Sequence, residues 1–235
     1  MNYVVSYWAP DDMASDRRDA LRRYFDLQHY TKTRFGGHQI ILTNIDYPSA
    51  IQLQVPTKFS KPYAMFAKYL GLGQMVRAGL EFPIALHDHD MFIRTQLPVN
   101  DTAIQCCSGS GSTFSDQLVV FPECSKDKLM AFIERLESFD FPLGFNAGYG
   151  CEVRHEEMFS TEVAAALMDP PPFAGMRIEV NIPFRDIVSF DILEHHSLDV
   201  AQCECQPISS DAVAVHAHIN KGPATDALID WLAAD

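Results

Sequence analysis

The chain has 235 residues, 47% of them hydrophobic, which is enough to bury one substantial core and fits one domain better than two. Its formal net charge of −13, from 31 acidic and 18 basic residues, disfavours nucleic acid as a partner because such a surface repels a phosphate backbone. The longest apolar runs are far shorter than the ~20 residues of a membrane-spanning helix, and the N-terminus lacks a signal-peptide pattern. We therefore expect a cytoplasmic globular protein.

The first elements alternate between strand and helix. Residues 3–7 are a short apolar, β-branched run that predicts a strand ending in a loop. A helix follows through residue 27, with Ser15 or Asp16 as its expected cap. Residues 39–43 predict a second buried strand.

The same alternation continues to the next strand. A proline-containing loop with a short strand over residues 51–55 leads to a helix that we expect to open at Pro62. The apolar run over residues 82–86 then predicts another strand. This order predicts a Rossmann-like α/β fold, with a mostly parallel central sheet, helices on both faces and ligand sites at the carboxyl ends of the strands.

The second half is less regular. Residues 100–115 predict an exposed loop or an irregular hairpin, residues 118–121 a strand, and Ser125 the cap of an amphipathic helix that extends through residue 136. Further expected elements are a turn over 141–150, helices over 163–168, 184–193 and 225–232, and strands over 177–182 and 212–219.

Two carboxylates follow the buried run over residues 82–86. Asp88 and Asp90 are two positions apart, so both can face one ion at the end of the strand. Mg²⁺ and Mn²⁺ prefer oxygen ligands and keep open positions for substrate phosphates, so one or two carboxylates suffice. The pattern indicates a divalent-metal site.

This arrangement of an apolar strand, Asp88-His89-Asp90 and a second apolar run resembles the Asp-x-Asp motif of GT-A-fold glycosyltransferases, most closely family 8. Residues 145–148, Phe-Asn-Ala-Gly, are similar to the family's turn that lines the donor and acceptor pockets. Residues 215–223 are similar to its histidine-containing C-terminal segment. The resemblance implies one GT-A-like domain over residues 1–235, with a nucleotide-binding half (1–99) ending in the Asp-x-Asp motif and an acceptor-side half (100–235).

The resemblance also implies roles for C-terminal residues. A histidine from this segment joins the two aspartates on the metal. His216 and His218 lie on the same face of the expected strand, and His218 is nearer to the loop carrying Lys221. By the same resemblance Lys221 and Gly222 contact the donor diphosphate.

Residues of the first half are assigned to the donor in the same way. Lys68, on the helix before the metal motif, is the candidate to reach the diphosphate or the sugar, with Arg77 competing for that role. Tyr7 and Trp8 stand where family enzymes hold the nucleotide base, so one of them could stack on uracil, or both could pack in the core.

The catalytic pocket of the family is represented by Asn146 and by Asp186, which stands where family members carry an Asp-Gln pair. Together these matches predict the transfer of a sugar from a nucleotide-sugar, with a UDP-sugar as the expected donor. The metal would be Mn²⁺ or Mg²⁺ and the acceptor a glycan or small molecule rather than nucleic acid. Retention and inversion at the sugar centre both stay open.

Two alternatives come from other classes. The alternating His-Asp-His-Asp of residues 87–90 could hold two metals and generate hydroxide in a hydrolase, with further ligands drawn from His155, His195 and His196. A non-catalytic sugar-binding module is the second alternative. A Rossmann oxidoreductase is disfavoured because no Gly-x-Gly-x-x-Gly follows the first strand.

Overall fold

The computed structural model describes residues 1–9, 13–54, 67–93, 95–107, 115–138, 177–182, 187–189 and 214–216. Its strands are β1 (Asn2–Tyr7), β2 (His38–Thr43), β3 (Ile51–Gln52), β4 (Ile84–His87), β5 (Met91–Ile93), β6 (Ala103–Cys107), β7 (Ser115–Phe121), β8 (Arg177–Ile182), β9 (Ile187–Ser189) and β10 (Ala214–His216). Its helices are α1 (Ser15–Thr33), α2 (Ala67–Arg77), the 3₁₀ turn η2 (Glu123–Ser125) and α3 (Lys126–Ser138).

Seven strands form the main sheet in the order β3-β2-β1-β4-β7-β6-β8. Within the described ranges β1 pairs in parallel with both β2 and β4, and the β2–β3 and β6–β8 pairs are also parallel. The β4–β7 and β6–β7 pairs are antiparallel. A smaller sheet follows the order β5-β10-β9. The mostly parallel α/β sheet predicted from the sequence is therefore confirmed.

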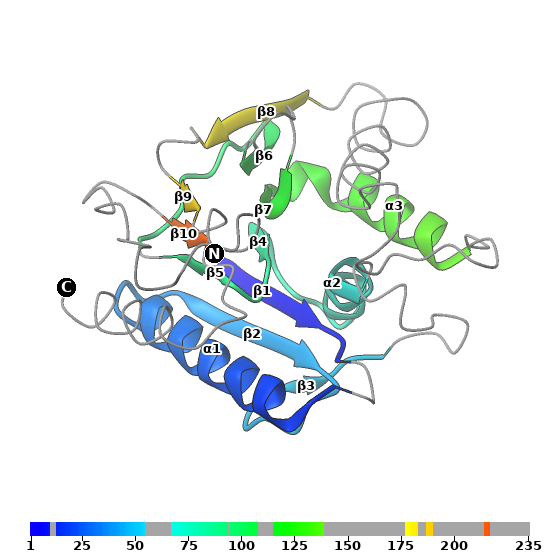
Figure 1. Ribbon diagram of the computed structural model, residues 1–235. Coiled ribbons are helices and arrows are strands. Elements are labelled where there is room, and N and C mark those ends of the chain that lie inside the picture. Colours follow the sequence, from blue (N-terminus) through cyan, green and yellow to red (C-terminus); the bar gives the residue numbers. More distant parts are fainter. Residues whose placement is uncertain are drawn as a thin grey trace, which may run out of the picture.

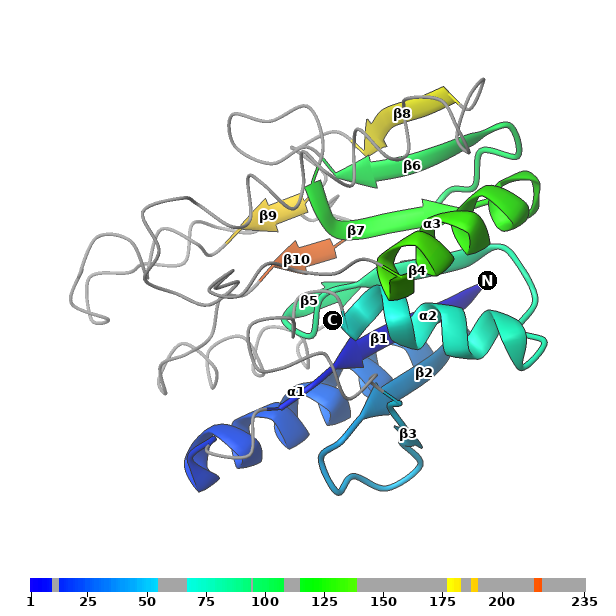
Figure 2. The ribbon, with the colours of Figure 1, turned by 90° about the vertical axis from the view of Figure 1, so that its right-hand side faces the viewer.

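Alternate strand residues bury themselves on opposite faces of the main sheet, as the two-residue period of a strand requires. Val4 and Leu86 belong to the apolar core that also contains Leu72 of α2 and Ile133 of α3. On the other face Val5 packs with residues of α1 and β2. Figure 1 shows α1 on one side of the sheet and α2 and α3 on the other, and Figure 2 shows α2 and α3 side by side. Helices on both faces were predicted.

The sequence located most early elements and missed the capping of α1. β1, α1, β2 and β4 stand where they were expected. The N-cap of α1, however, is Ala14 and makes no side-chain capping hydrogen bond, and Asp16 accepts from the neighbouring Arg17 N–H instead. Near α3 the Ser125 hydroxyl donates to the Pro122 carbonyl over 2.7 Å.

Of two later expectations, one held in its hairpin alternative and the other was wrong. Part of the predicted loop over residues 100–115 is the strand β6, whose Ile104 is fully buried; its antiparallel pairing with β7 agrees with the hairpin alternative. Within the predicted helix over 184–193 lies the strand β9, which pairs in parallel with β10. The elements expected at Pro62 and over 141–150, 163–168 and 225–232 lie outside the described residues, and the division at residue 99 stays a prediction. None of the described helices combines the length and apolarity needed to cross a membrane.

One lysine is buried without a hydrogen-bond partner. Lys32, near the end of α1, is fully buried, and its Nζ lies 5.7 Å from the centroid of the Tyr3 ring. Burial lowers the pKa of this ammonium well below its ordinary value of 10.5. The contact with the ring face offsets part of the desolvation cost, but an unpaired polar group in a core is destabilising.

Replacing Lys32 by methionine should therefore stabilise the fold at pH 7 by about 1–3 kcal/mol. The pH dependence is a second signature. The unfolded chain keeps the proton up to its ordinary pKa of 10.5, whereas folded Lys32 releases it at lower pH, so wild-type stability rises with pH between these two values. Urea unfolding at several pH values should show that Lys32→Met removes this rise. Lys126→Met, at an exposed lysine, serves as control. A loss of stability in Lys32→Met would contradict a destabilising burial of Lys32.

Helix α2 packs closely on β1 at a glycine. A Cβ added at Gly71 would lie 2.2 Å from Ser6 Oγ and 2.7 Å from Ser6 Cβ. Because Ser6 is held within β1 and its Cβ is itself part of the overlap, turning a side chain cannot relieve it.

Gly71→Ala should lower the free energy of unfolding by about 1–3 kcal/mol, although alanine favours a helix by about 1 kcal/mol over glycine. Urea unfolding measures the change. In a Ser6→Gly background the same substitution should cost less, since the nearest remaining contact of its Cβ is then Leu53 Cδ1 at 3.1 Å. Equal costs in the two backgrounds would contradict this contact.

Candidate active site

The two carboxylates stand on a turn at the carboxyl end of a central strand. β4 ends at His87, Asp88–Asp90 form the turn, and β5 begins at Met91, whose N–H donates to the Asp88 carbonyl over 3.2 Å. Asp90 is buried, whereas the Asp88 side chain is 28% exposed. The carboxyl ends of the parallel strands β1, β2 and β4 meet at this edge, which is where open α/β sheets bind ligands.

A lysine from α2 reaches this turn. Lys68 Nζ lies 2.8 Å from Asp88 Oδ1, and its side chain is only 10% exposed, so the ion pair is partly shielded from water. The competing Arg77, at the other end of α2, makes a double contact of 2.8 and 2.7 Å with Glu137 of α3. Of the two basic residues that the sequence singled out, the structure brings Lys68 to the carboxylates.

Tyr7 and Trp8 follow one another at the end of β1 but face opposite sides of the sheet. Tyr7 packs with the cluster around α1, and its ring centroid is 4.4 Å from that of His89. Desolvation raises the pKa of the Tyr7 hydroxyl; the charge of Arg17 opposes this shift and that of Asp90 adds to it. Trp8 packs against the core beneath α2 and α3. Tyr7 is therefore beside the carboxylate turn.

Two buried polar side chains hold the backbone of the turn: Gln28, which sequence reasoning missed, and His87, which it considered only as a ligand in the hydrolase alternative. Gln28, fully buried on α1, donates from Nε2 to the carbonyls of His89 (2.5 Å) and Asp88 (3.4 Å). His87 Nδ1 lies 2.8 Å from the Asp88 carbonyl, which can only accept, so Nδ1 carries the proton. Burial and the nearby charge of Lys32 lower the pKa of His87 well below 6.5, so this imidazole is neutral. The sequence signal that could have revealed Gln28 is its position among the buried residues of α1, where a polar side chain is unusual.

Asn44 is a second residue that the sequence did not single out. Its side chain pairs with the backbone of Ala9, accepting from the N–H over 2.6 Å and donating to the carbonyl over 2.7 Å. The Asn44 amide thus satisfies both backbone hydrogen-bonding groups of Ala9, the residue that follows Trp8. This fixes the course of the chain as it leaves β1 at the ligand-binding edge.

The smaller sheet brings a C-terminal strand to the turn. β10 runs antiparallel to β5, so that the backbone of His216 stands opposite Met91, the residue after Asp90. Other predicted site residues, namely Asn146, Asp186, His218, Lys221 and Gly222, lie outside the described residues. Among the described side chains no group of three or more His, Cys, Asp or Glu residues could hold a metal ion. Asp88 and Asp90 offer carboxylate oxygens at this edge, the ligand type that a hard divalent cation prefers.

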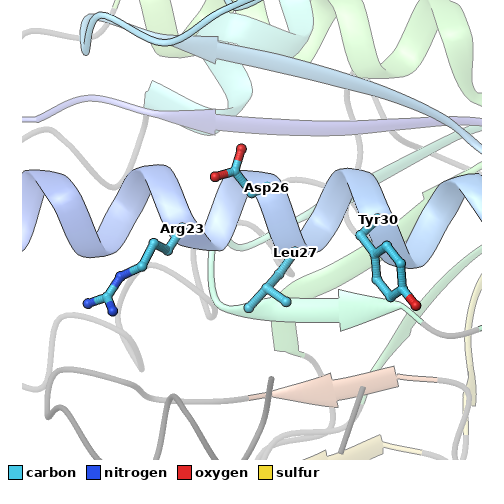
Figure 3. Close-up of a pocket in the computed structure, with 4 residues that line it drawn as sticks. All are labelled: Arg23, Asp26, Leu27 and Tyr30. Carbon is cyan, nitrogen blue, oxygen red and sulfur yellow. The ribbon is translucent and has the colours of Figure 1, made fainter. Parts of the chain in front are cut away.

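A separate shallow pocket of about 240 Å³ opens on α1, lined by Arg23, Asp26, Leu27 and Tyr30 (Figure 3). Asp26 accepts a hydrogen bond from the Tyr47 hydroxyl over 2.8 Å. The residues of α1 that contact the carboxylate turn are others: Gln28, through its amide, and Tyr24, whose ring centroid is 6.2 Å from that of His89. The pocket is therefore distinct from the candidate site.

Solved structures of glycosyltransferases share this fold. One involved in the glycosylation of the major capsid of PBCV-1 has a TM-score of 0.53 at 8% identity, covering 96% of this chain and 97% of that one. An active-site mutant of LgtC has a TM-score of 0.51 at 11% identity, covering 100% and 95%. GlyE of Streptococcus pneumoniae TIGR4 has a TM-score of 0.51 at 12% identity, covering 100% of this chain and 62% of GlyE.

No protein-family model matches the chain, and no curated protein matches its sequence. At identities of 8–12% the structural likeness concerns the fold. The resemblance drawn from the sequence is confirmed at that level: the chain has the GT-A-like α/β fold of these glycosyltransferases.

Proposed function

We propose that this chain is a glycosyltransferase that moves a sugar from a nucleotide-sugar, with a UDP-sugar as the expected donor, to a glycan or small-molecule acceptor. The observation that carries the proposal is the position of Asp88 and Asp90 on one turn at the carboxyl end of β4, with Lys68 paired to Asp88. In a GT-A-like sheet this edge is where a nucleotide donor would bind.

Asp88 and Asp90 are the proposed ligands of Mn²⁺ or Mg²⁺, and a histidine of the C-terminal segment is the proposed third ligand. The pairing of β10 with β5 favours His216, since its backbone stands opposite the residue after Asp90; His218 is the alternative. When bound, the cation would supply positive charge to stabilise the nucleoside diphosphate as it leaves.

The protein's own cations are proposed to share that task. Lys68 is shielded from water beside Asp88, so its charge acts more strongly on a nearby phosphate than that of an exposed lysine. Lys221 and Gly222 are proposed to contact the same diphosphate. Tyr7, beside the turn, is a better candidate than Trp8 to contact the nucleotide, because Trp8 packs against the core under α2 and α3.

Asn146 and Asp186 stay proposals for the catalytic pocket. Asp186 immediately precedes β9 in the sequence, and the pairing of β9 with β10, the strand that carries His216, supports this proposal. The acidic surface favours a neutral acceptor over nucleic acid.

The hydrolase alternative is not favoured by the geometry. It needs the alternating histidines and aspartates of the turn to act together as metal ligands. His87 is fully buried with Nδ1 bonded to the Asp88 carbonyl, and the His89 ring packs against those of Tyr7 and Tyr24. Neither histidine is arranged with the aspartates as a ligand set.

Binding can be tested by thermal unfolding with UDP, UDP-glucose and UDP-galactose, each with and without Mn²⁺, since a ligand that binds the folded state raises the transition. We expect the transition to rise in a metal-dependent way, and Asp88→Asn and Asp90→Asn to abolish this rise. Asp101→Asn, at an exposed turn, should keep it. His216→Asn and His218→Asn identify the third ligand.

A rise that survives both aspartate substitutions would refute the proposed metal site. If no nucleotide shifts wild-type unfolding, the proposed donor class is wrong. Release of UDP from the donor that binds, measured with neutral glycan acceptors, then tests the transfer itself.

Lys68→Met should weaken the binding of UDP in the presence of saturating Mn²⁺ by about tenfold, which corresponds to ~1.4 kcal/mol. The affinity for Mn²⁺ alone should stay equal or increase, because Asp88 loses a positive neighbour that competes with the cation. Isothermal titration of each ligand measures both constants. Lys126→Met is the matched control, and a loss of Mn²⁺ affinity in Lys68→Met would instead assign Lys68 to supporting Asp88.

A further inference from the structure

The backbone of the carboxylate turn is fixed by a convergence of donors on one atom. The Asp88 carbonyl oxygen receives the Met91 N–H over 3.2 Å, the His87 Nδ1–H over 2.8 Å and the Gln28 amide over 3.4 Å. A carbonyl oxygen has two lone pairs, so these three donors saturate it and oppose rotation of the peptide that links Asp88 to His89. The direction of the Asp88 side chain depends on that peptide.

Gln28 is the member of this set that comes from another element. Its Nε2 also donates to the His89 carbonyl over 2.5 Å, so a single side chain of α1 holds two consecutive carbonyls between Asp88 and Asp90. An amide buried in this way has lost its water and is tied to the packing of the whole helix. The turn therefore takes its position from α1 as well as from β4 and β5.

The stability of the protein does not explain a glutamine at this position. Position 28 lies on the buried stripe of α1, which includes Leu21, Tyr24 and Phe25, where an apolar residue would normally pack. Gln28 Oε1, His87 Nε2 and Lys32 Nζ are buried without hydrogen-bond partners, and each such atom costs free energy. Buried groups of this kind close to a functional turn call for a functional explanation.

We propose that Gln28 is a positioning residue that fixes the direction of the Asp88 and Asp90 carboxylates and so sets the affinity for the divalent cation. It is neither a ligand nor a catalytic group; it acts through the backbone carbonyls of Asp88 and His89. The inference rests on the metal site of the proposed function.

The chain offers a matched control in Gln39, on β2. Its Nε2 also donates to two backbone carbonyls, those of Tyr3 (3.3 Å) and Ile40 (3.0 Å), and its Oε1 is likewise buried without a partner. Gln39 lies near the beginning of β2, opposite Tyr3 in the register, whereas the carboxylate turn lies beyond the carboxyl end of β4. Gln39→Met removes the same chemistry away from the turn.

The test compares Gln28→Met with Gln39→Met in the full chain by two readouts. One is the dissociation constant of Mn²⁺ alone; the other is hydrogen exchange of the backbone amides at residues 88–91, measured without metal. Gln28→Met should bind Mn²⁺ at least about tenfold more weakly and exchange faster at the turn, with unfolding unchanged or shifted upward. Gln39→Met should leave both readouts at their wild-type values. Gln28→Glu, which keeps the shape and replaces the donor by a carboxylate, should act in the same direction as Gln28→Met.

The outcomes separate this inference from the function on which it rests. Wild-type affinity for Mn²⁺ in both Gln28 variants, or equal losses in Gln28→Met and Gln39→Met, would overturn the positioning role alone. If the wild-type protein binds no Mn²⁺, the proposed metal site fails and the inference fails with it.

Discussion

The parallel pairing of β1 with β2 on one side and β4 on the other is the interaction on which the site depends. In this register Tyr7 stands opposite Thr43, and Val5 stands opposite His87. All three strands therefore end at the same edge of the sheet. A parallel strand needs a crossover connection, and here α1 and α2 supply it on opposite faces. Both helices then reach the same turn, α1 through Gln28 and α2 through Lys68.

Local sequence patterns predicted the elements whose own apolar residues show the period of a buried strand or helix. β1, β2 and β4 are short apolar runs, and α3 shows a clear helical period, so periodicity was sufficient for them. β9 was missed, and β6 was expected only as one of two alternatives, because neither strand follows from its own residues. β6 pairs with β7 and β8, and β9 pairs with β10. Propensity is overridden where pairing partners come from distant segments.

The residues of the candidate site also fall into those that the sequence predicts and those that it does not. Asp88 and Asp90 were predictable because ionised side chains directly after a buried strand are conspicuous, and the resemblance to a known family added Lys68. Gln28 and Asn44 were not, because their partners are backbone carbonyls and N–H groups of segments 35 or more residues away, which leave no mark in the local sequence. Residues that touch a ligand can be inferred from their chemistry, whereas residues that hold such groups in place require the fold.

Charge places a further constraint on the proposed chemistry. A chain of net charge −13 repels an anionic diphosphate, and the edge that would receive it already carries two carboxylates. Two of the described arginines pair with carboxylates elsewhere: Arg22 with Asp19, and Arg77 with Glu137. Lys68, shielded and directed at Asp88, offsets one of the two carboxylates at most. The divalent cation proposed for Asp88 and Asp90 would reverse the sign of the local charge, and a nucleoside diphosphate would then meet a positive site.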